Sequence, residues 1–235
     1  MPSAENSPST ALSDTTSETQ LARNWLHTAR FLTTAAQLNQ LPRLDVPEIA
    51  FVGRSNAGKS TCINTLTQQR QLAYASKTPG RTQHINLFAL GKQGLMDAVL
   101  TDLPGYGYAA VPQEAKRRWQ LVMANYLMKR ENLRAVVLLC DARLGLTELD
   151  ERLLEIIRPR VEAGLDFLVL LTKADKLNRS EAQKVLSIAK LQTGGGGVRL
   201  FSSLKKVGVA EVALQMRTWA PAIEPPANPS DIEPS

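Results

Sequence analysis

Apolar residues along the chain follow two spacings, and each spacing predicts a type of secondary structure. Apolar runs of strand length occur at residues 48–52, 85–90, 98–102, 135–140, 167–171 and 198–201. Longer segments with helical periodicity separate most of these runs, at residues 113–129, 147–157, 180–191 and 209–219. Strands that alternate with helices are typical of an α/β fold, with a mostly parallel central sheet and helices on both faces.

The region before the first apolar run has the periodicity of a helix. Leu21, Trp25, Ala29, Leu32 and Ala36 recur at helical spacing. This pattern predicts an amphipathic helix over residues 21–38, which leads to a proline at position 42.

The two ends of the chain differ from its middle. Residues 1–20 are rich in Ser, Thr, Pro and Glu, and residues 221–235 contain five prolines. Such segments bury too little apolar surface to offset their ordering entropy. We therefore expect a disordered tail at residues 1–20, one α/β domain at residues 21–220, and a disordered Pro-rich tail at residues 221–235.

Net charge is concentrated in this middle region. The whole chain carries +6, but each tail holds three acids and no base. Residues 21–220 therefore hold 28 basic and 16 acidic residues, a net charge of +12. A body this basic favours a polyanionic partner, although a solvated basic surface gives the same composition.

Composition also limits where the protein works. No apolar run approaches the length that crosses a bilayer, and residues 1–20 lack the basic and hydrophobic regions of a secretory signal. The two cysteines, Cys62 and Cys140, are too few for a disulfide framework. We expect a cytoplasmic protein without integral membrane association, and a monomer.

A phosphate-binding motif follows the first strand directly. The segment GRSNAGKS matches G-x-x-x-x-G-K-[ST] and precedes a helix-compatible stretch. Glycines let backbone N–H groups surround phosphate oxygens, while Lys59 reaches the β- and γ-phosphates and Ser60 ligates Mg²⁺. The candidate nucleotide-binding residues here are Gly53, Arg54, Ser55, Asn56, Ala57, Gly58, Lys59 and Ser60.

A second motif, DLPG, ends the strand at residues 98–102. Asp102 stands 43 residues after Lys59, where it holds Mg²⁺ through water, and Gly105 offers its backbone N–H to a γ-phosphate. The alternative role for Asp102 is a helix cap or turn residue. The candidate nucleotide-binding residues are Asp102, Leu103, Pro104 and Gly105.

The third motif, TKAD, follows the strand at residues 167–171. Asp175 is suited to accept hydrogen bonds from N1–H and the 2-amino group of guanine, which adenine lacks, and the stem of Lys173 lies over the ring. FSS, after the last strand, offers backbone N–H groups to guanine O6. The base-site candidates are Thr172, Lys173, Ala174, Asp175, Phe201, Ser202 and Ser203.

Taken in order, these motifs resemble one known family. GRSNAGKS, KTPGRTQHIN at 77–86, DLPGYGYA at 102–109, TKAD and FSSLK at 201–205 are similar to those of the EngB family of ribosome-assembly GTPases. The resemblance covers most of residues 21–220.

This resemblance implies a Ras-like P-loop fold and binding of GTP and GDP with Mg²⁺. It further implies a role in maturing the large (50S) ribosomal subunit through rRNA, with effects on cell division and septation. It places a second magnesium ligand at Thr82, with Thr78 as the competing threonine. It assigns nucleotide contacts to Gly80, Arg81, Thr82, Gln83 and His84.

The expected reaction is attack of water on the γ-phosphoryl of GTP, with Lys59 and Thr82 as catalytic groups. Tyr106 stands where Ras-type enzymes carry a water-orienting Gln, so intrinsic turnover should be slow. Arg81 is either a stabilising cation or an RNA contact. Asn56 either helps to hold K⁺ or stabilises the loop's turn.

Three functional readings follow from these motifs. A ribosome-assembly GTPase is preferred. A GTP-dependent interaction switch with incidental hydrolysis is close to it, and TKAD disfavours a metabolic P-loop kinase. Basic residues that are candidates for rRNA phosphate contact are Lys116, Arg117, Arg118, Lys129, Arg130, Arg134, Lys205 and Lys206.

Overall fold

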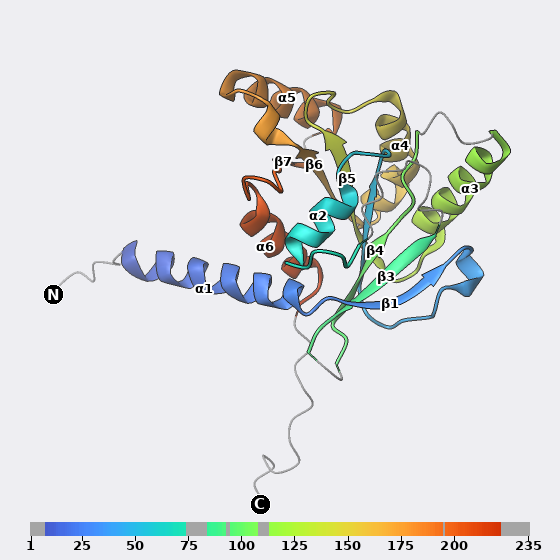
Figure 1. Cartoon of the computed structure of the whole chain (residues 1–235), viewed down its shortest axis with the longest axis horizontal. Helices are drawn as coiled ribbons and strands as arrows, with labels where there is room; N and C mark the ends of the chain where they lie inside the picture. The colour runs from blue at the N-terminus through green and yellow to red at the C-terminus, as the bar shows by residue number, and fades with distance from the viewer. Residues whose placement is uncertain (1–7, 74–83, 93–94, 108–112, 195, 222–235) are drawn as a thin grey trace, which may run out of the picture.

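The central feature of the computed structural model is a seven-stranded sheet, formed within the residues that the structure describes: 8–73, 84–92, 95–107, 113–194 and 196–221. The strand order is β1-β3-β4-β2-β5-β6-β7 (Figure 1). The strands are β1 (Arg30–Ala35), β2 (Glu48–Gly53), β3 (Ile85–Leu90), β4 (Ala98–Asp102), β5 (Leu133–Asp141), β6 (Asp166–Thr172) and β7 (Gly197–Leu200). β3 pairs antiparallel with β1 and β4, and the other pairs are parallel, which confirms the mostly parallel sheet.

Helices cover both faces of the sheet, as the alternating pattern predicts (Figure 1). One face carries α1 (Pro8–His27), α2 (Lys59–Leu66) and α6 (Val209–Trp219), whose apolar residues share one core cluster. The other face carries α3 (Gln113–Lys129), α4 (Glu148–Glu162) and α5 (Arg179–Gln192). Short 3₁₀ turns, η1 (Leu38–Gln40) and η2 (Ala174–Lys176), complete the described elements.

Strand β2 lies in the middle of the sheet and joins the two cores. Ile49 and Phe51 belong to the core beneath α2, whereas Ala50 and Val52 belong to the core beneath α3 and α4. All four residues are fully buried. Such continuous burial is what a strand covered on both faces requires, and it fixes the position of the loop that follows.

The helix predicted over residues 21–38 is wrong in its extent. α1 ends at His27, where the Thr28 backbone N–H and hydroxyl both donate to the Trp25 carbonyl. Residues Arg30–Ala35 instead form β1, because the free edge of β3 offers them backbone partners. α1 also begins at Pro8, so residues 8–20 are helical in the structure, in contrast to the predicted disordered tail.

No helix within the described residue ranges is long and apolar enough to cross a membrane.

Candidate functional site

The predicted motifs meet at one edge of the sheet. Gly53, Asp102, Asp141 and Thr172 end the neighbouring parallel strands β2, β4, β5 and β6. Carboxyl ends of parallel strands lie together at one edge, which is where open α/β sheets bind ligands. The phosphate and base motifs are therefore adjacent although they are far apart in the sequence.

The loop after β2 has the backbone of a phosphate cradle. Asn56 and Gly58 adopt positive φ angles of 66° and 90°. A Cβ at Gly53 would stand 2.6 Å from the Leu139 carbonyl oxygen, so that position requires glycine. The loop leads into α2 at Lys59, whose first-turn N–H groups are then available to an anion.

Lys59 and Asp102 form the charged centre of the phosphate end. The Lys59 ammonium donates to Asp102 Oδ1, and both side chains are nearly excluded from solvent. Asp102 Oδ2 is buried without a hydrogen-bond partner. An orphaned carboxylate oxygen fits a hard, oxygen-seeking cation such as Mg²⁺, and half-buried Ser60 at the start of α2 carries a second oxygen donor.

The DLPG segment is attached to the phosphate loop by backbone contacts. The Leu103 N–H donates to the Phe51 carbonyl at 3.1 Å, and the Ser55 N–H donates to the Tyr106 carbonyl at 2.8 Å. A Cβ on Gly105 would stand 3.1 Å from three atoms of Ser55. Movement of one loop therefore requires adjustment of the other, and buried Pro104 lies between these contacts.

Tyr106 is directed away from a water-orienting role. Its hydroxyl donates to Asp150 Oδ1 at 2.5 Å, and Asp150 Oδ2 accepts from the Thr147 backbone N–H and hydroxyl at the start of α4. Burial, together with the neighbouring Asp150 carboxylate, raises the pKa of the Tyr106 phenol well above its usual range. The structure thus agrees with the expectation that this side chain does not align a nucleophile.

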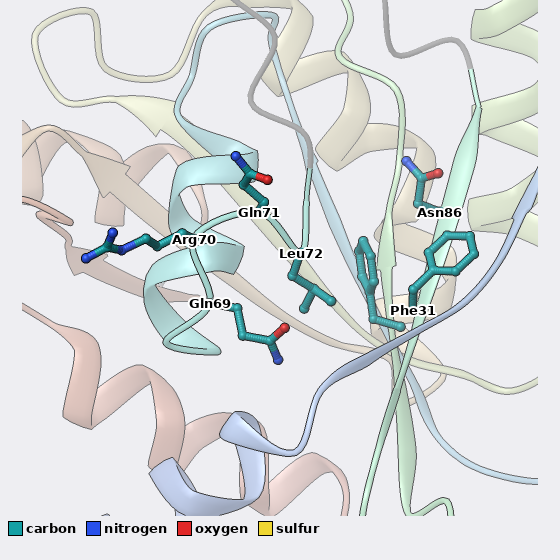
Figure 2. A pocket seen from close by; sticks show the side chains of 7 residues that line it. Phe31, Gln69, Arg70, Gln71, Leu72 and Asn86 are labelled. Atoms are coloured by element: carbon teal, nitrogen blue, oxygen red, sulfur yellow. The ribbon is translucent and has the colours of Figure 1, made fainter.

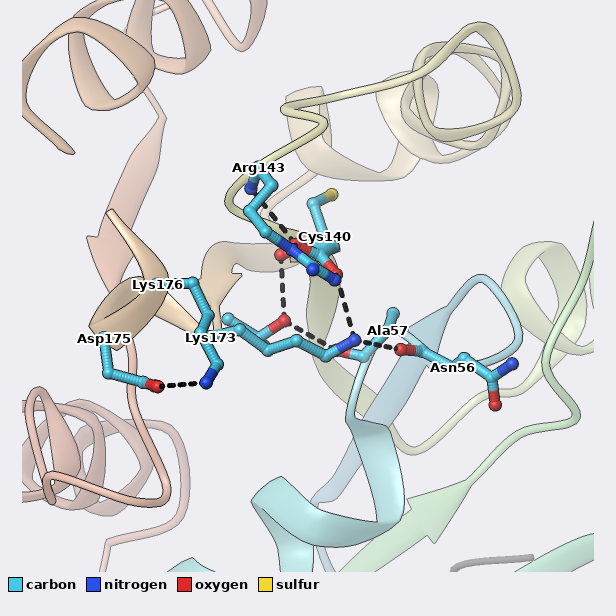
Figure 3. Close-up of polar contacts among 9 residues, drawn as sticks. Asn56, Ala57, Cys140, Arg143, Lys173, Asp175 and Lys176 are labelled. Atoms are coloured by element: carbon cyan, nitrogen blue, oxygen red, sulfur yellow. Dashed lines mark hydrogen bonds and ion pairs between the residues drawn. The ribbon is translucent and has the colours of Figure 1, made fainter. Parts of the chain in front are cut away.

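Lys173 connects the base end to the phosphate end (Figure 3). Its ammonium donates to the Asn56 carbonyl at 2.8 Å and to Asp141 Oδ2 at 2.9 Å. The residue itself adopts a left-handed φ of 57°, which directs the chain into η2. Arg143 also donates to Asp141, and its guanidinium is the leading cause that lowers the pKa of this carboxyl.

Asp175 is oriented from a separate loop. Ser202 donates its hydroxyl to Asp175 Oδ1 at 2.6 Å, and the Lys205 backbone N–H donates to the same Ser202 oxygen at 3.0 Å. The Ser202 hydrogen bond is the leading cause that lowers the pKa of Asp175. The carboxylate is thereby held ionised, as recognition of two guanine N–H groups requires. Ala174 and Phe201 link the same segments through a backbone hydrogen bond, while Ser203 is half-buried.

Thr172 stabilises the site rather than offering a free side chain. Its hydroxyl lies 2.6 Å from the Ala57 carbonyl and 3.1 Å from the Cys140 carbonyl. It therefore fixes the phosphate loop against β5.

Not every candidate residue falls within this constellation. Gly80, Arg81, Thr82 and Gln83, together with Thr78, lie outside the described residues, whereas His84 is exposed just before β3. Arg54 and Leu103 flank the cradle, and the Arg54 Nε is buried without a partner.

The predicted basic surface also needs one correction. Arg130 is not available to a polyanion, because its guanidinium donates to the buried carboxylate of Glu48 and is only 13% exposed. Arg134 pairs with Asp166. Arg117, Lys129, Lys205 and Lys206 are exposed.

Two contacts of the site do not follow from the motifs. Asp141, at the end of β5, accepts from Lys173 although it belongs to no motif. Ser202 belongs to the predicted FSS segment after β7, but the contact that the structure gives its hydroxyl is a hydrogen bond to Asp175. The available signal for Asp141 is its position at the end of an apolar strand next to β6, whereas the bond from Ser202 depends on the fold.

Comparison with known proteins identifies the family to which the chain is similar. The 50S ribosome-binding GTPase family matches residues 48–173, more than half of the chain. A "Probable GTP-binding protein EngB" from Polaromonas sp. is 72% identical over 220 residues, which cover 94% of this chain and 90% of the relative. A protein of the same name from Paraburkholderia phytofirmans is 47% identical over 203 residues, covering 83% and 92%.

Solved structures support the fold. The crystal structure of a probable GTP-binding protein engB aligns with a TM-score of 0.59 at 19% identity, covering 74% of this chain and 98% of that one. Era in complex with MgGDPNP and 16S ribosomal RNA aligns with a TM-score of 0.61 at 20% identity, covering 81% and 61%. The predicted Ras-like fold is thus confirmed, and with the sequence matches the chain belongs to the EngB family of P-loop GTPases.

Proposed function

We propose that this GTPase acts as an assembly factor for the large ribosomal subunit and that normal cell division and septation depend on it. The observation that carries the proposal is the convergence of Lys59, Asp102 and Asp175 at one sheet edge, in a chain matched by a 50S ribosome-binding GTPase family. The basic surface that faces solvent suits rRNA as the partner. We place this activity in the cytoplasm, in a monomer.

The proposed reaction is hydrolysis of GTP to GDP and phosphate. Amides of the loop 53–60 hold the phosphates, and Lys59 leaves Asp102 to neutralise the β- and γ-phosphate oxygens. Ser60 and Asp102 are the described residues that would hold Mg²⁺, with Thr82 as the further proposed ligand. When bound, Mg²⁺ neutralises charge on the phosphate oxygens.

Slow intrinsic turnover is part of the proposal. The Tyr106 hydroxyl is engaged by Asp150, so this side chain does not position the attacking water. Because positioning and charge neutralisation supply most of the acceleration in phosphoryl transfer, a missing water-orienting group lowers the rate without affecting nucleotide affinity. Asp175, held by Ser202, supplies the selection for guanine.

A requirement for K⁺ is a second proposed property of the site. Asn56 is exposed, and a solved FeoB structure with bound GDP.AlF4⁻ and K⁺ shares the fold at a TM-score of 0.51. The positive φ of Asn56 also fits the alternative, a turn-stabilising role. We expect faster GTP turnover in K⁺ than in Na⁺ at equal ionic strength, with the difference lost in Asn56→Ala. Equal rates for the unmodified protein in both salts would remove K⁺ from the proposal.

The assembly role is tested by sedimentation of the purified protein with large ribosomal subunits. We expect co-sedimentation with GTP or a non-hydrolysable analogue and release with GDP. Lys59→Ala is the control that cannot respond to GTP, and Ser60→Ala separates the alternative of an interaction switch. A Ser60→Ala protein that still supports assembly without hydrolysing GTP would favour the interaction switch. Co-sedimentation that does not depend on the bound nucleotide would contradict both the assembly GTPase and the interaction switch.

A further inference from the structure

A pocket separate from the nucleotide site lies between the end of α2 and the edge strand β1 (Figure 2). Its volume is about 670 Å³, which is within the range of small-molecule sites. Residues of three chain segments line it: 69–72 after α2, Phe31 on β1, and two residues of β3. Among the described residues, Asn86, the last residue of KTPGRTQHIN, is the one motif residue that lines this pocket.

The floor of the pocket is apolar and carries an exposed aromatic ring. Phe88 is almost completely buried, and Leu72 is half-buried beside it. Phe31 packs edge-on against Phe88, with ring centroids 6.3 Å apart and planes at 65°, yet it remains 58% exposed. A half-exposed ring over a fixed apolar floor offers a face on which a planar group can stack.

Carboxamides surround this apolar floor. Gln71 and Asn86 lie at one end of the pocket and Gln69 at the other (Figure 2). Gln69 Nε2 donates to the Ala29 carbonyl, whereas the side chains of Gln71 and Asn86 have no hydrogen-bond partner among the described residues. Each carboxamide supplies both a donor and an acceptor, which is the mixture that the edge of a nucleobase presents.

The rim of the pocket is positive. Arg70 is exposed and extends away from the other lining residues (Figure 2), and the described residues give its guanidinium no ion pair. No carboxylate is among the lining residues that the structure describes. A guanidinium at the rim, beside stacking and hydrogen-bonding groups in the interior, complements a phosphate attached to a base.

We propose that this pocket binds an unpaired nucleobase of an RNA strand, with the base against Phe31 and the adjoining phosphate near Arg70. The inference rests on the proposed function, since it names how an RNA partner is held. An apolar peptide side chain in the same pocket would contact the Phe31 ring but would use none of the donors and acceptors of the Gln71 and Asn86 carboxamides. A nucleobase would stack on the Phe31 ring and would also form hydrogen bonds with the Gln71 and Asn86 carboxamides.

The test measures binding of a fluorescent single-stranded oligoribonucleotide to the full-length protein by anisotropy. We expect Phe31→Ala to weaken binding at least about fivefold, as loss of one stacked base does. Phe31→Leu should weaken it similarly, since leucine is apolar but has no aromatic face, whereas Phe31→Trp should retain binding. Leu32→Ala removes a neighbouring exposed apolar side chain that does not line the pocket, and it should bind like the unmodified protein.

A duplex of the same sequence provides the second arm, because its bases are paired and stacked. We expect Phe31→Ala to leave duplex binding unchanged. The proposal is overturned if the unmodified protein does not bind the single strand, if Phe31→Ala binds it equally well, or if Leu32→Ala loses as much. Preserved thermal unfolding and GTP binding in the variants exclude misfolding, and Phe31→Leu is decisive if Phe31→Ala unfolds. Failure of the unmodified protein to sediment with ribosomal subunits would contradict the assembly role, but it would not alter the measured binding of single-stranded RNA.

Discussion

The phosphate end and the base end of the nucleotide site are built in different ways. At the phosphate end, the backbone conformation of a continuous loop and one buried ion pair, Lys59 with Asp102, determine the geometry. At the base end, Asp175 depends on a hydroxyl from a loop that follows another strand. The phosphate end is thus local and backbone-based, whereas the base end is assembled from side chains of distant segments.

This difference separates affinity from selectivity. Every nucleoside triphosphate offers the same phosphates, so a backbone cradle with a lysine supplies binding without discrimination. Discrimination between guanine and adenine requires one carboxylate with a fixed orientation. Lys173 links the two ends through its hydrogen bond to the Asn56 carbonyl, so disturbance of the phosphate loop is transmitted to the base end.

The largest effect is expected from a substitution at the phosphate end. Lys59→Ala should reduce GTP turnover at least about 100-fold, because it removes a cation that neutralises charge developing on the phosphates. It also leaves the Asp102 carboxylate buried without its partner. Phosphate release and titration with a fluorescent GTP analogue measure both losses. Lys184→Ala, an exposed lysine on α5, is the control, and turnover in Lys59→Ala equal to this control would contradict the assignment.

The next largest effect is expected from a substitution that changes the base end alone. Asp175→Asn should weaken GTP binding roughly 10- to 100-fold, because a charge-assisted pair of hydrogen bonds is lost. Binding of xanthosine triphosphate should improve, since its altered edge complements the amide. Competition titrations provide the measurement, with Asp166→Asn as the matched surface control. An unchanged preference for guanine would remove Asp175 from this role.

A smaller effect sharpens the comparison through pH. Ser202 holds the pKa of Asp175 low, so the carboxylate stays charged at neutral pH and loses its charge only as the pH falls through that low value. Ser202→Ala should raise this pKa toward the usual aspartate range. GTP binding should then be roughly two- to tenfold weaker at neutral pH and begin its acid decline at a higher pH. Affinity titrations at several pH values measure this shift, with Ser203→Ala as the neighbouring control. If GTP affinity falls at the same acidic pH in both variants, Ser202 does not set the pKa of Asp175.

The smallest effect concerns Tyr106. Tyr106→Phe removes one hydrogen bond to Asp150, whose other oxygen keeps its two bonds from Thr147. We expect the free energy of unfolding to fall by about 1 kcal/mol and GTP turnover to change less than about twofold. Denaturant unfolding and steady-state kinetics measure the two quantities. A large loss of turnover at unchanged stability would instead mean that the hydroxyl acts on the attacking water.

The phosphate end could be recognised from the sequence because it is contiguous. GRSNAGKS places its glycines and Lys59 within one loop, and the flanking strand and helix have clear periodicity. The fold class and six of the seven described strands follow from the same patterns. FSS is predicted at the base site from the sequence, but the hydrogen bond from the Ser202 hydroxyl to Asp175 and the contact between Asp141 and Lys173 could not be predicted, because these pairs form only through the order of strands in the sheet.

Two boundaries show where local pattern fails for physical reasons. The sequence of β1 has the apolar spacing of a helix and no clear strand pattern. The segment becomes a strand because it pairs with β3, a long-range interaction that local sequence does not reveal. α4 continues through Pro159 to Glu162, although the pattern predicts its end at Ile157. The continuation is held from outside the helix, where Arg160 donates to the carbonyls of Leu127 and Leu133.

The irregular pairing of β1 has a consequence for the solubility of the protein. β1 is the outermost strand beside β3, and its register shifts between Phe31 and Thr33. Such a bulge interrupts the row of backbone groups that a strand from another molecule would need as a template. The edge is also only six residues long. The same irregularity therefore disfavours sheet extension between molecules and aggregation through this edge, while it leaves Phe31 accessible to solvent.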